Sequence, residues 1–295
     1  LGVYINVYVD DFHSAGSEKA MPKSWKLLED VGIKFDPPTS FNGGTYSGCT
    51  QHDIPTLSPE VTAKEALYTD YVVENPMEGK KFTAETMRHI PTPIRAKAAA
   101  RRKELRDEKR AAALPTIASA KNVAHPYAHV KSWEYDMRGS AQACLDTYCS
   151  LSGASEDQIK IYQTPCMDDA SMLPSDFERK GELSPVCSRI VLKALYLARL
   201  ARPDLLWAVN SLAREVTKWN VACDRRLERL MGYIKITSNQ TIKAHIGDNF
   251  EDCRLVCFTD ASWADSKPDS KSTSGGLVAI MGPNTYIPVS YTHLT

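Results

Sequence analysis

The chain has 295 residues, 43% hydrophobic and 24% charged, which is the composition of an ordinary globular protein of about two domains. Its 36 Lys and Arg balance 36 Asp and Glu, so any role in nucleic-acid binding must come from a local basic patch. No apolar run reaches the length of about 18 residues that a membrane span needs, so a membrane-spanning helix is excluded. No secretory signal is visible at Leu1, and the eight cysteines contain no C-x-x-C pair, so reduced thiols in an intracellular protein are expected.

The N-terminus predicts a β-hairpin. Residues 1–9 are rich in β-branched and aromatic side chains, and residues 12–15 form the returning strand. Asp10 and Asp11 stand at the bend between them.

A helix and two short strands are expected next. The helix covers residues 23–31 and ends at Gly32, a residue that commonly terminates helices. The strands lie near residues 33–35 and 45–49, on either side of a loop rich in Pro and Gly.

From residue 51 to 129 the signals of regular structure weaken. Residues 95–110 are rich in helix formers and carry eight basic against three acidic residues, with Leu105 as the one large apolar side chain. Such a helix has no apolar stripe to bury, so it is either a solvated linker or a contact to a polyanion. Its candidate nucleic-acid contacts are Arg101, Arg102 and Arg106.

Regular structure returns in the second half of the chain. A strand over 130–135 and a helix over 139–151 precede a loop-like stretch, and three amphipathic helices over 184–201, 203–218 and 224–234 then predict a small helical subdomain. The period of the hydrophobic pattern then changes to that of strands, expected at residues 241–246, 254–259, 275–281 and 285–290.

The adjacent carboxylates of Asp10 and Asp11 are the sharpest chemical signal. Burying a carboxylate without a partner is costly, and a divalent cation removes that cost. Mg²⁺ prefers oxygen ligands and uses one or two protein carboxylates together with water and substrate phosphates. The alternative interpretation is a solvated turn, and Asp260, which follows a strand, could equally be a turn former.

Several motifs together resemble a known family. Tyr8-Val9-Asp10-Asp11 resembles the Tyr-x-Asp-Asp catalytic hairpin of reverse transcriptases. Residues 201–214 are similar to a segment that copia-type retrotransposon polyproteins carry between polymerase and RNase H. Further similar segments, with Ile236 where the family has Gly, are residues 232–237, 258–265 and 272–276.

The resemblance implies roles for single residues. Asp10 and Asp11 would hold catalytic Mg²⁺, with Mn²⁺ as a substitute, and Tyr8 would lie near the primer and the incoming nucleotide. Asp260 would be the first metal-binding carboxylate of an RNase H fold. The implied partners are an RNA template, a DNA primer, deoxynucleoside triphosphates, an RNA–DNA hybrid and the rest of the Pol polyprotein, and no membrane.

The resemblance also implies an α+β fold, a partial palm and connection with a helical subdomain, followed by an incomplete RNase H-like sheet. Its expected parts are the C-terminal part of a palm (1–50), a poorly ordered linker with the basic helix (51–129), a connection or helical subdomain (130–238) and the N-terminal part of an RNase H-like domain (239–295).

The expected function is RNA-directed DNA polymerase with RNase H, acting inside the cell in the cytoplasm, in virus-like particles or in the nucleus. A further palm aspartate would precede Leu1 and further RNase H carboxylates would follow Thr295, so the isolated chain is expected to be inactive. The alternative is a non-catalytic nucleic-acid-binding or scaffold remnant of such an element. Residues 291–295 depart from the family pattern, which suggests a truncation or a transcript-assembly junction.

A zinc site is a second possibility on paper. Cys49 and His52 have C-x₂-H spacing, and His125 and His129 have H-x₃-H spacing. The alternative is structural, because residues 46–49 resemble the Tyr-Leu-Gly end of a family strand.

Overall fold

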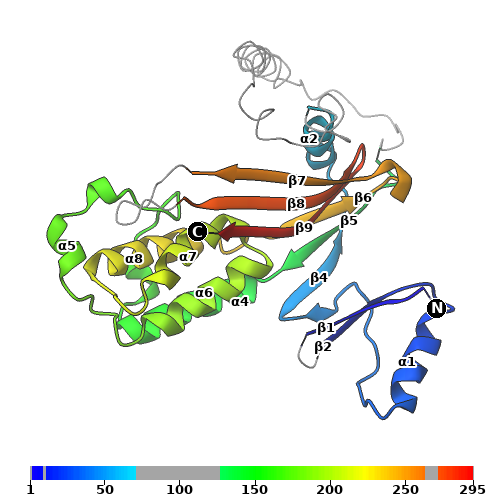
Figure 1. Ribbon diagram of the computed structural model, residues 1–295, viewed down its shortest axis with the longest axis horizontal. Coiled ribbons are helices and arrows are strands. Elements are labelled where there is room, and N and C mark those ends of the chain that lie inside the picture. The colour runs from blue at the N-terminus through cyan, green and yellow to red at the C-terminus, as the bar shows by residue number, and fades with distance from the viewer. Residues whose placement is uncertain (1, 9–10, 71–126, 263–271, 295) are drawn as a thin grey trace. The chain divides into compact units, whose positions relative to one another are not determined.

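The computed structural model describes residues 2–8, 11–70, 127–262 and 272–294 (Figure 1). The chain divides into two compact units, one formed by Leu1–Glu65 with His129–Thr295 and the other by Ala66–Ala128. The fold below is that of the first unit. Among the helices that the structure describes, none combines the length and the apolar character that crossing a membrane requires.

The fold is of the mixed α+β type, and its sheets are antiparallel, which confirms the expected class at this level. In the described part of the chain, one hairpin stands apart from a seven-stranded sheet of order β3-β4-β5-β6-β9-β8-β7. The strands of the large sheet are β3 (Thr45–Tyr46), β4 (Cys49–Ile54), β5 (Lys131–Asp136), β6 (Ile242–Ile246), β7 (Arg254–Ala261), β8 (Ser274–Gly282) and β9 (Thr285–Leu294).

The predicted N-terminal hairpin is confirmed by β1 (Tyr4–Tyr8) and β2 (Asp11–Ala15), which pair in register. The helix that follows is α1 (Met21–Asp30), and Gly32 after it adopts the left-handed conformation with a φ of 91°. The strand expected at 33–35 is wrong, because this stretch has no regular structure. Its Phe35 ring packs on Trp25 instead, at 5.0 Å between centroids.

The region around residue 48 is a second hairpin that the sequence analysis missed. Ser47 and Gly48 both have positive φ, at 51° and 69°, which is the geometry of a two-residue turn between antiparallel strands. The single strand expected at 45–49 is therefore β3, a turn and the first residue of β4. Beyond it, β4 and α2 (Ser58–Tyr68) occupy part of the stretch expected to be a poorly ordered linker.

Four helices build the main apolar core, and Figure 1 shows them gathered on one side of the strands. They are α4 (Arg138–Ser152), α6 (Cys187–Leu200), α7 (Leu206–Arg214) and α8 (Val221–Ile236). These helices confirm the expected elements. The shorter helices of the described residues are η3 (Glu156–Gln158), η4 (Asp169–Ser171), α5 (Pro174–Glu178), η5 (Pro203–Leu205) and η6 (Phe250–Asp252).

The start of α6 differs from the expected one. The sequence predicts a helix from residue 184, but turns cover residues 182–186 and the helix begins at Cys187. The backbone amide of Cys187 donates to the Leu183 carbonyl at 2.7 Å, so the turns lead directly into the helix.

The large sheet and the core run through several of the expected segments. Strands from residues 1–50, 51–129, 130–238 and 239–295 all contribute to the sheet. Cys49 packs in the same buried cluster as Met137 and Ile234, and Tyr291 lies against it. The expected division of the chain into four parts stays a prediction.

Strand β9 contains most of the tail that departs from the family pattern. Its backbone pairs with β8 as far as Leu294, which lies opposite Ser274. The register shifts by one residue between Val278 and Ala279, whose partners are Ser290 and Pro288. The extra residue, Val289, makes a β-bulge, the irregularity at which a strand tolerates proline.

Two helical glycines provide a matched test of the core. A Cβ on Gly232 in α8 would lie 1.9 Å from the Lys160 carbonyl oxygen, whereas one on Gly139 in α4 would meet nothing within 4 Å. We expect Gly232→Ala to lower the free energy of unfolding by about 2 to 3 kcal/mol, because the core must shift. Gly139→Ala should raise it by about 0.5 to 1 kcal/mol through helix propensity. Urea denaturation measures both, and a harmless Gly232→Ala would contradict the packing described.

A second cluster lies where α2 meets β6 and β9. The Lys64 ammonium stands 4.0 Å from the centroid of the Tyr286 ring, and the Lys243 ammonium pairs with Glu60 at 2.7 Å. His245 is 6% exposed, and its Nε2 has no hydrogen-bond partner among the described residues. Burial, and then the nearby Lys64, lowers the pKa of His245.

This arrangement predicts a pH-dependent stability. The pKa of His245 is lowered in the folded state. The stability that the neutral imidazole contributes to the unfolding free energy is therefore fully present above the ordinary pKa of 6.5, and it is lost as the pH falls from there toward the folded-state pKa. His245→Phe should therefore remove part of the decrease in unfolding free energy between about pH 7 and pH 5. The exposed His129→Asn should keep that decrease. Identical pH profiles for wild type and His245→Phe would contradict this assignment.

Candidate functional site

The end of the β1–β2 hairpin is where the sequence places its main candidate site. Tyr8 and Asp11 are the last pair of the ladder, so the strands bring these two predicted residues directly opposite each other. The structure describes them by their backbone, and Asp10 lies outside the described residues. The backbone thus places one predicted metal ligand and the predicted nucleotide-proximal tyrosine at the same end of a hairpin.

Both faces of this hairpin are anchored by packing. Phe12 on β2 contacts the Trp25 and Phe35 rings, at centroid distances of 6.3 and 5.9 Å. The next residue, His13, lies on the opposite face and stacks on Tyr46 at 5.0 Å, since side chains alternate along a strand. Asp11 therefore directly precedes two anchored residues.

Asp260, the second candidate metal ligand, lies near the end of β7. It is exposed and pairs in register with Gly275 of β8. Its Oδ1 accepts a hydrogen bond from the Ala261 amide at 2.9 Å. Beyond the ladder, the Ser262 amide donates to the Thr273 carbonyl at 2.8 Å. Two sequence motifs, 258–265 and 272–276, are thus neighbours in space over their described residues.

Two of the sequence motifs, residues 201–214 and 232–237, meet at a buried arginine. Arg202 is 3% exposed, and its Nε and Nη2 donate to the two carboxylate oxygens of Asp204 at 2.9 and 2.7 Å. Its Nη1 and Nη2 also donate to the carbonyl and hydroxyl oxygens of Thr237, at 2.9 and 2.7 Å. The Tyr233 hydroxyl donates to Asp204 at 3.0 Å. Motif residues more than 30 positions apart therefore form one hydrogen-bonded network.

The zinc alternative does not fit the strand geometry. Cys49 is buried while His52, three positions along the same strand, faces the opposite side and is partly exposed. Burial, and then the Asp136 carboxylate, raises the pKa of Cys49 to about 11, which disfavours the thiolate that zinc binds. His125 lies outside the described residues. Among the residues that are described, no three His, Cys, Asp or Glu side chains are grouped to hold a metal ion.

The predicted nucleic-acid contacts Arg101, Arg102 and Arg106 also lie outside the described residues. Their role stays a prediction.

A cavity that the sequence analysis did not foresee lies beside the hairpin. Its volume is about 1060 Å³, and it is lined by residues of β1, β2, the β3–β4 hairpin, β5, β6, β9 and the helices α6 and α7. The Tyr196 hydroxyl of α6 donates to the Ser47 carbonyl and thereby joins two of its walls. A Cβ on Gly48 would lie 2.6 Å from that hydroxyl, so the glycine is needed for close approach as well as for its positive φ.

The buried arginine gives a clear test. Arg202→Gln leaves the Asp204 carboxylate and the Thr237 carbonyl short of donors, so we expect a loss of about 3 kcal/mol in unfolding free energy. The matched control is Arg199→Gln, an exposed residue of the preceding helix, which should change stability by less than about 0.5 kcal/mol. Urea denaturation would compare them, and equal losses would contradict a structural role for the network.

No protein-family model matches the chain, and no solved structure matches it significantly. The interpretation of the site therefore depends on the motifs and the geometry described above.

Proposed function

We propose that the chain is part of a copia-type retrotransposon polyprotein, spanning the end of a reverse-transcriptase palm, a connection with a helical subdomain and the start of an RNase H-like sheet. The complete intracellular protein would synthesise DNA on an RNA template and hydrolyse the RNA strand of the hybrid. The 295 residues alone would carry a partial set of ligands for each reaction and would be inactive.

The observation that carries this proposal is the hairpin whose last ladder pair is Tyr8 and Asp11. The pairing of Tyr8 with Asp11 puts the first and last residues of the Tyr-x-Asp-Asp sequence at one end of two anchored strands. Catalytic groups need this kind of rigid support, because small displacements of a reacting group cost large factors in rate.

The other motifs support the same proposal by their proximity. The motif at residues 201–214 and the motif at residues 232–237 meet in the hydrogen-bonded network of Arg202. The segment that contains Asp260 pairs with the Ser-Thr-Ser-Gly-Gly segment, as Thr259 lies opposite Gly276 and Asp260 opposite Gly275. The proximity of motifs that are far apart in the sequence supports the family resemblance.

The chain's own residues would act by position and charge. Asp11, and with it Asp10, would provide carboxylates at the hairpin end, and Tyr8 on the opposite strand would support the primer terminus and the nucleotide. Mg²⁺ bound there would stabilise the attacking primer 3′-hydroxyl oxygen and the leaving pyrophosphate. The exposed carboxylate of Asp260 has one oxygen engaged by the backbone, and its other oxygen has no partner among the described residues.

The polymerase assignment is tested with the reading frame extended upstream and downstream of this segment. Primer extension on an RNA template with Mg²⁺ should fall by about 100-fold or more in Asp10→Asn and Asp11→Asn, because each removes a metal ligand. Asp30→Asn is the control, since it makes the same change at an exposed residue at the end of α1.

The outcomes separate the two functional classes. Activity that is lost in both hairpin variants and kept in Asp30→Asn supports the polymerase. Stop codons on both sides of the segment, or an extended protein without primer extension, would instead support a non-catalytic remnant. Hybrid cleavage by the extended protein that is unchanged in Asp260→Asn would contradict the metal-binding role of Asp260.

A further inference from the structure

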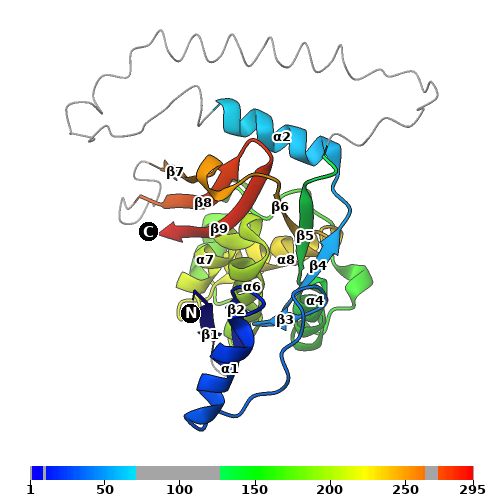
Figure 2. The same cartoon turned by 90° about the vertical axis from the view of Figure 1, so that its right-hand side faces the viewer.

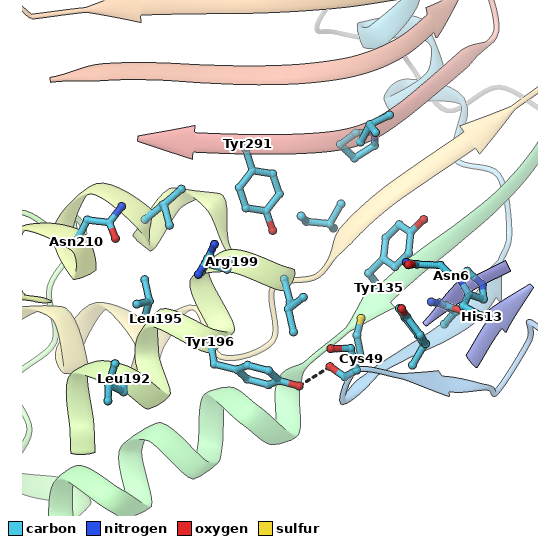
Figure 3. Close-up of a pocket in the computed structure, with 18 residues that line it drawn as sticks. Asn6, His13, Cys49, Tyr135, Leu192, Leu195, Tyr196, Arg199, Asn210 and Tyr291 are labelled. Atoms are coloured by element: carbon cyan, nitrogen blue, oxygen red, sulfur yellow. Dashed lines mark hydrogen bonds between the residues drawn. The ribbon is translucent and has the colours of Figure 1, made fainter. Parts of the chain in front are cut away.

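The cavity beside the hairpin has walls of different chemistry (Figure 3). One wall is apolar and comes largely from the helices, while the opposite wall carries polar and aromatic side chains of the strands. The apolar residues are Leu192, Leu195, Leu200, Leu206, Ile242, Pro288 and Val289. A ligand that fills this space needs both an apolar surface and polar groups.

One cation faces this space without an anion. Arg199 lines the cavity from the last turn of α6, is exposed, and forms no ion pair with any described residue. The helix also carries Arg189 and Lys193 and has no Asp or Glu in its sequence. The planar guanidinium is suited to bidentate binding of phosphate or carboxylate, so Arg199 selects for an anionic group.

Aromatic rings provide a stacking surface on the strand side. His13 and Tyr46 are stacked at 5.0 Å with an interplanar angle of 32°, and Tyr135 of β5 lines the same wall. Figure 3 shows Tyr135 and His13 on the strand side of the cavity, across from Arg199 and Leu195 on the helices. Rings of this kind stack on nucleobases with little dependence on sequence.

One polar side chain at the cavity has no hydrogen-bond partner among the described residues. Asn210 of α7 lines this space and is partly buried, and its side-chain amide forms no hydrogen bond there. A partly buried polar group without a partner is costly, so a bound molecule that satisfies it gains affinity. The Tyr291 hydroxyl also lacks a hydrogen bond, but it is inaccessible, so a ligand in the cavity does not reach it.

We propose that this cavity binds a nucleotide unit, with its phosphate at Arg199, its base on the aromatic wall, and a polar atom of its base or sugar paired with Asn210. An aliphatic carboxylate would leave the rings and the Asn210 amide unmatched. The unit comes either from a free mononucleotide or from one nucleotide of a single strand. The site goes beyond the proposed function, because it uses neither a metal nor Asp10 and Asp11.

Calorimetric titration of the 295-residue chain in EDTA tests the site. EDTA removes divalent cations, so binding through metal at Asp10 and Asp11 is excluded. Deoxyadenosine monophosphate should bind, and deoxyadenosine should bind about tenfold or more weakly, because it lacks the charge-assisted contact. An oligodeoxyadenylate of about ten nucleotides is the polymeric probe.

Matched variants locate the binding. Arg199→Gln should weaken the monophosphate by about tenfold and leave deoxyadenosine unchanged, because only the phosphate contact is lost. Arg189→Gln, on the same helix outside the cavity, should change neither. Tyr46→Leu should weaken both probes alike, since it removes stacking.

The outcomes of the titration decide the proposal. Equal affinity for the monophosphate and the oligonucleotide assigns the site to a free nucleotide, and binding of the oligonucleotide alone assigns it to a strand. No binding of either probe at millimolar concentration overturns the proposal, and so do equal losses in Arg199→Gln and Arg189→Gln. Binding is measured without metal or catalysis. Nucleotide binding can therefore be observed when primer extension fails, and primer extension can be observed when this cavity binds no nucleotide.

Discussion

The fold depends on the burial of one positive charge. Arg202 is almost inaccessible, and taking a guanidinium out of water is costly unless all its donors find acceptors. The carboxylate of Asp204 and the two oxygens of Thr237 provide those acceptors. Thr237 is the C-cap of α8, where the carbonyl ends of the helix favour a cation. The pairing therefore connects the end of α6, the start of η5 and the end of α8.

This connection determines where the chain enters the sheet. Strand β6 begins at Ile242, five residues after Thr237, and pairs with β5 on one side and with β9 on the other. Strands β3 to β5 and strands β7 to β9 thus meet in a single sheet around β6. Figure 2 gives a second view of the strands and helices of this unit. The positions of the cavity walls on β5, β6 and β9 follow from the same junction.

Local patterns in the sequence predicted local structure well. Strands β1, β2 and β5 to β9, and helices α1, α4, α7 and α8, lie where hydrophobic periodicity and turn residues indicated them. The errors have physical reasons. Residues 33–35 look like a strand because the apolar Ile33 and Phe35 alternate with Lys34, but Phe35 packs in an aromatic cluster with Phe12 and Trp25. The β3–β4 turn at Ser47 was missed because only Gly48 was a turn signal, and both residues adopt positive φ.

Contacts between distant residues could not be predicted in the same way. The hairpin that carries Tyr8 and Asp11 is a local feature, so its motif was visible in the sequence. The network of Arg202 with Thr237 joins residues 35 positions apart, and the bond from Tyr196 to Ser47 joins residues 149 apart. No periodicity encodes such pairs. A resemblance to a family indicated the Arg202 segment as a motif, and its hydrogen bonds provide a physical reason for that motif.

The cavity and the hairpin share a structural element, and this has an energetic consequence. Asn6 and His13 line the cavity and pair with each other, two positions along the ladder from Tyr8 and Asp11. A ligand stacked on His13 would restrict a strand whose end holds the predicted metal ligand. Binding at one place would then alter affinity at the other, and the coupling would be equal in both directions. The element that transmits it would be a hairpin held from its other face by Phe12 on Trp25.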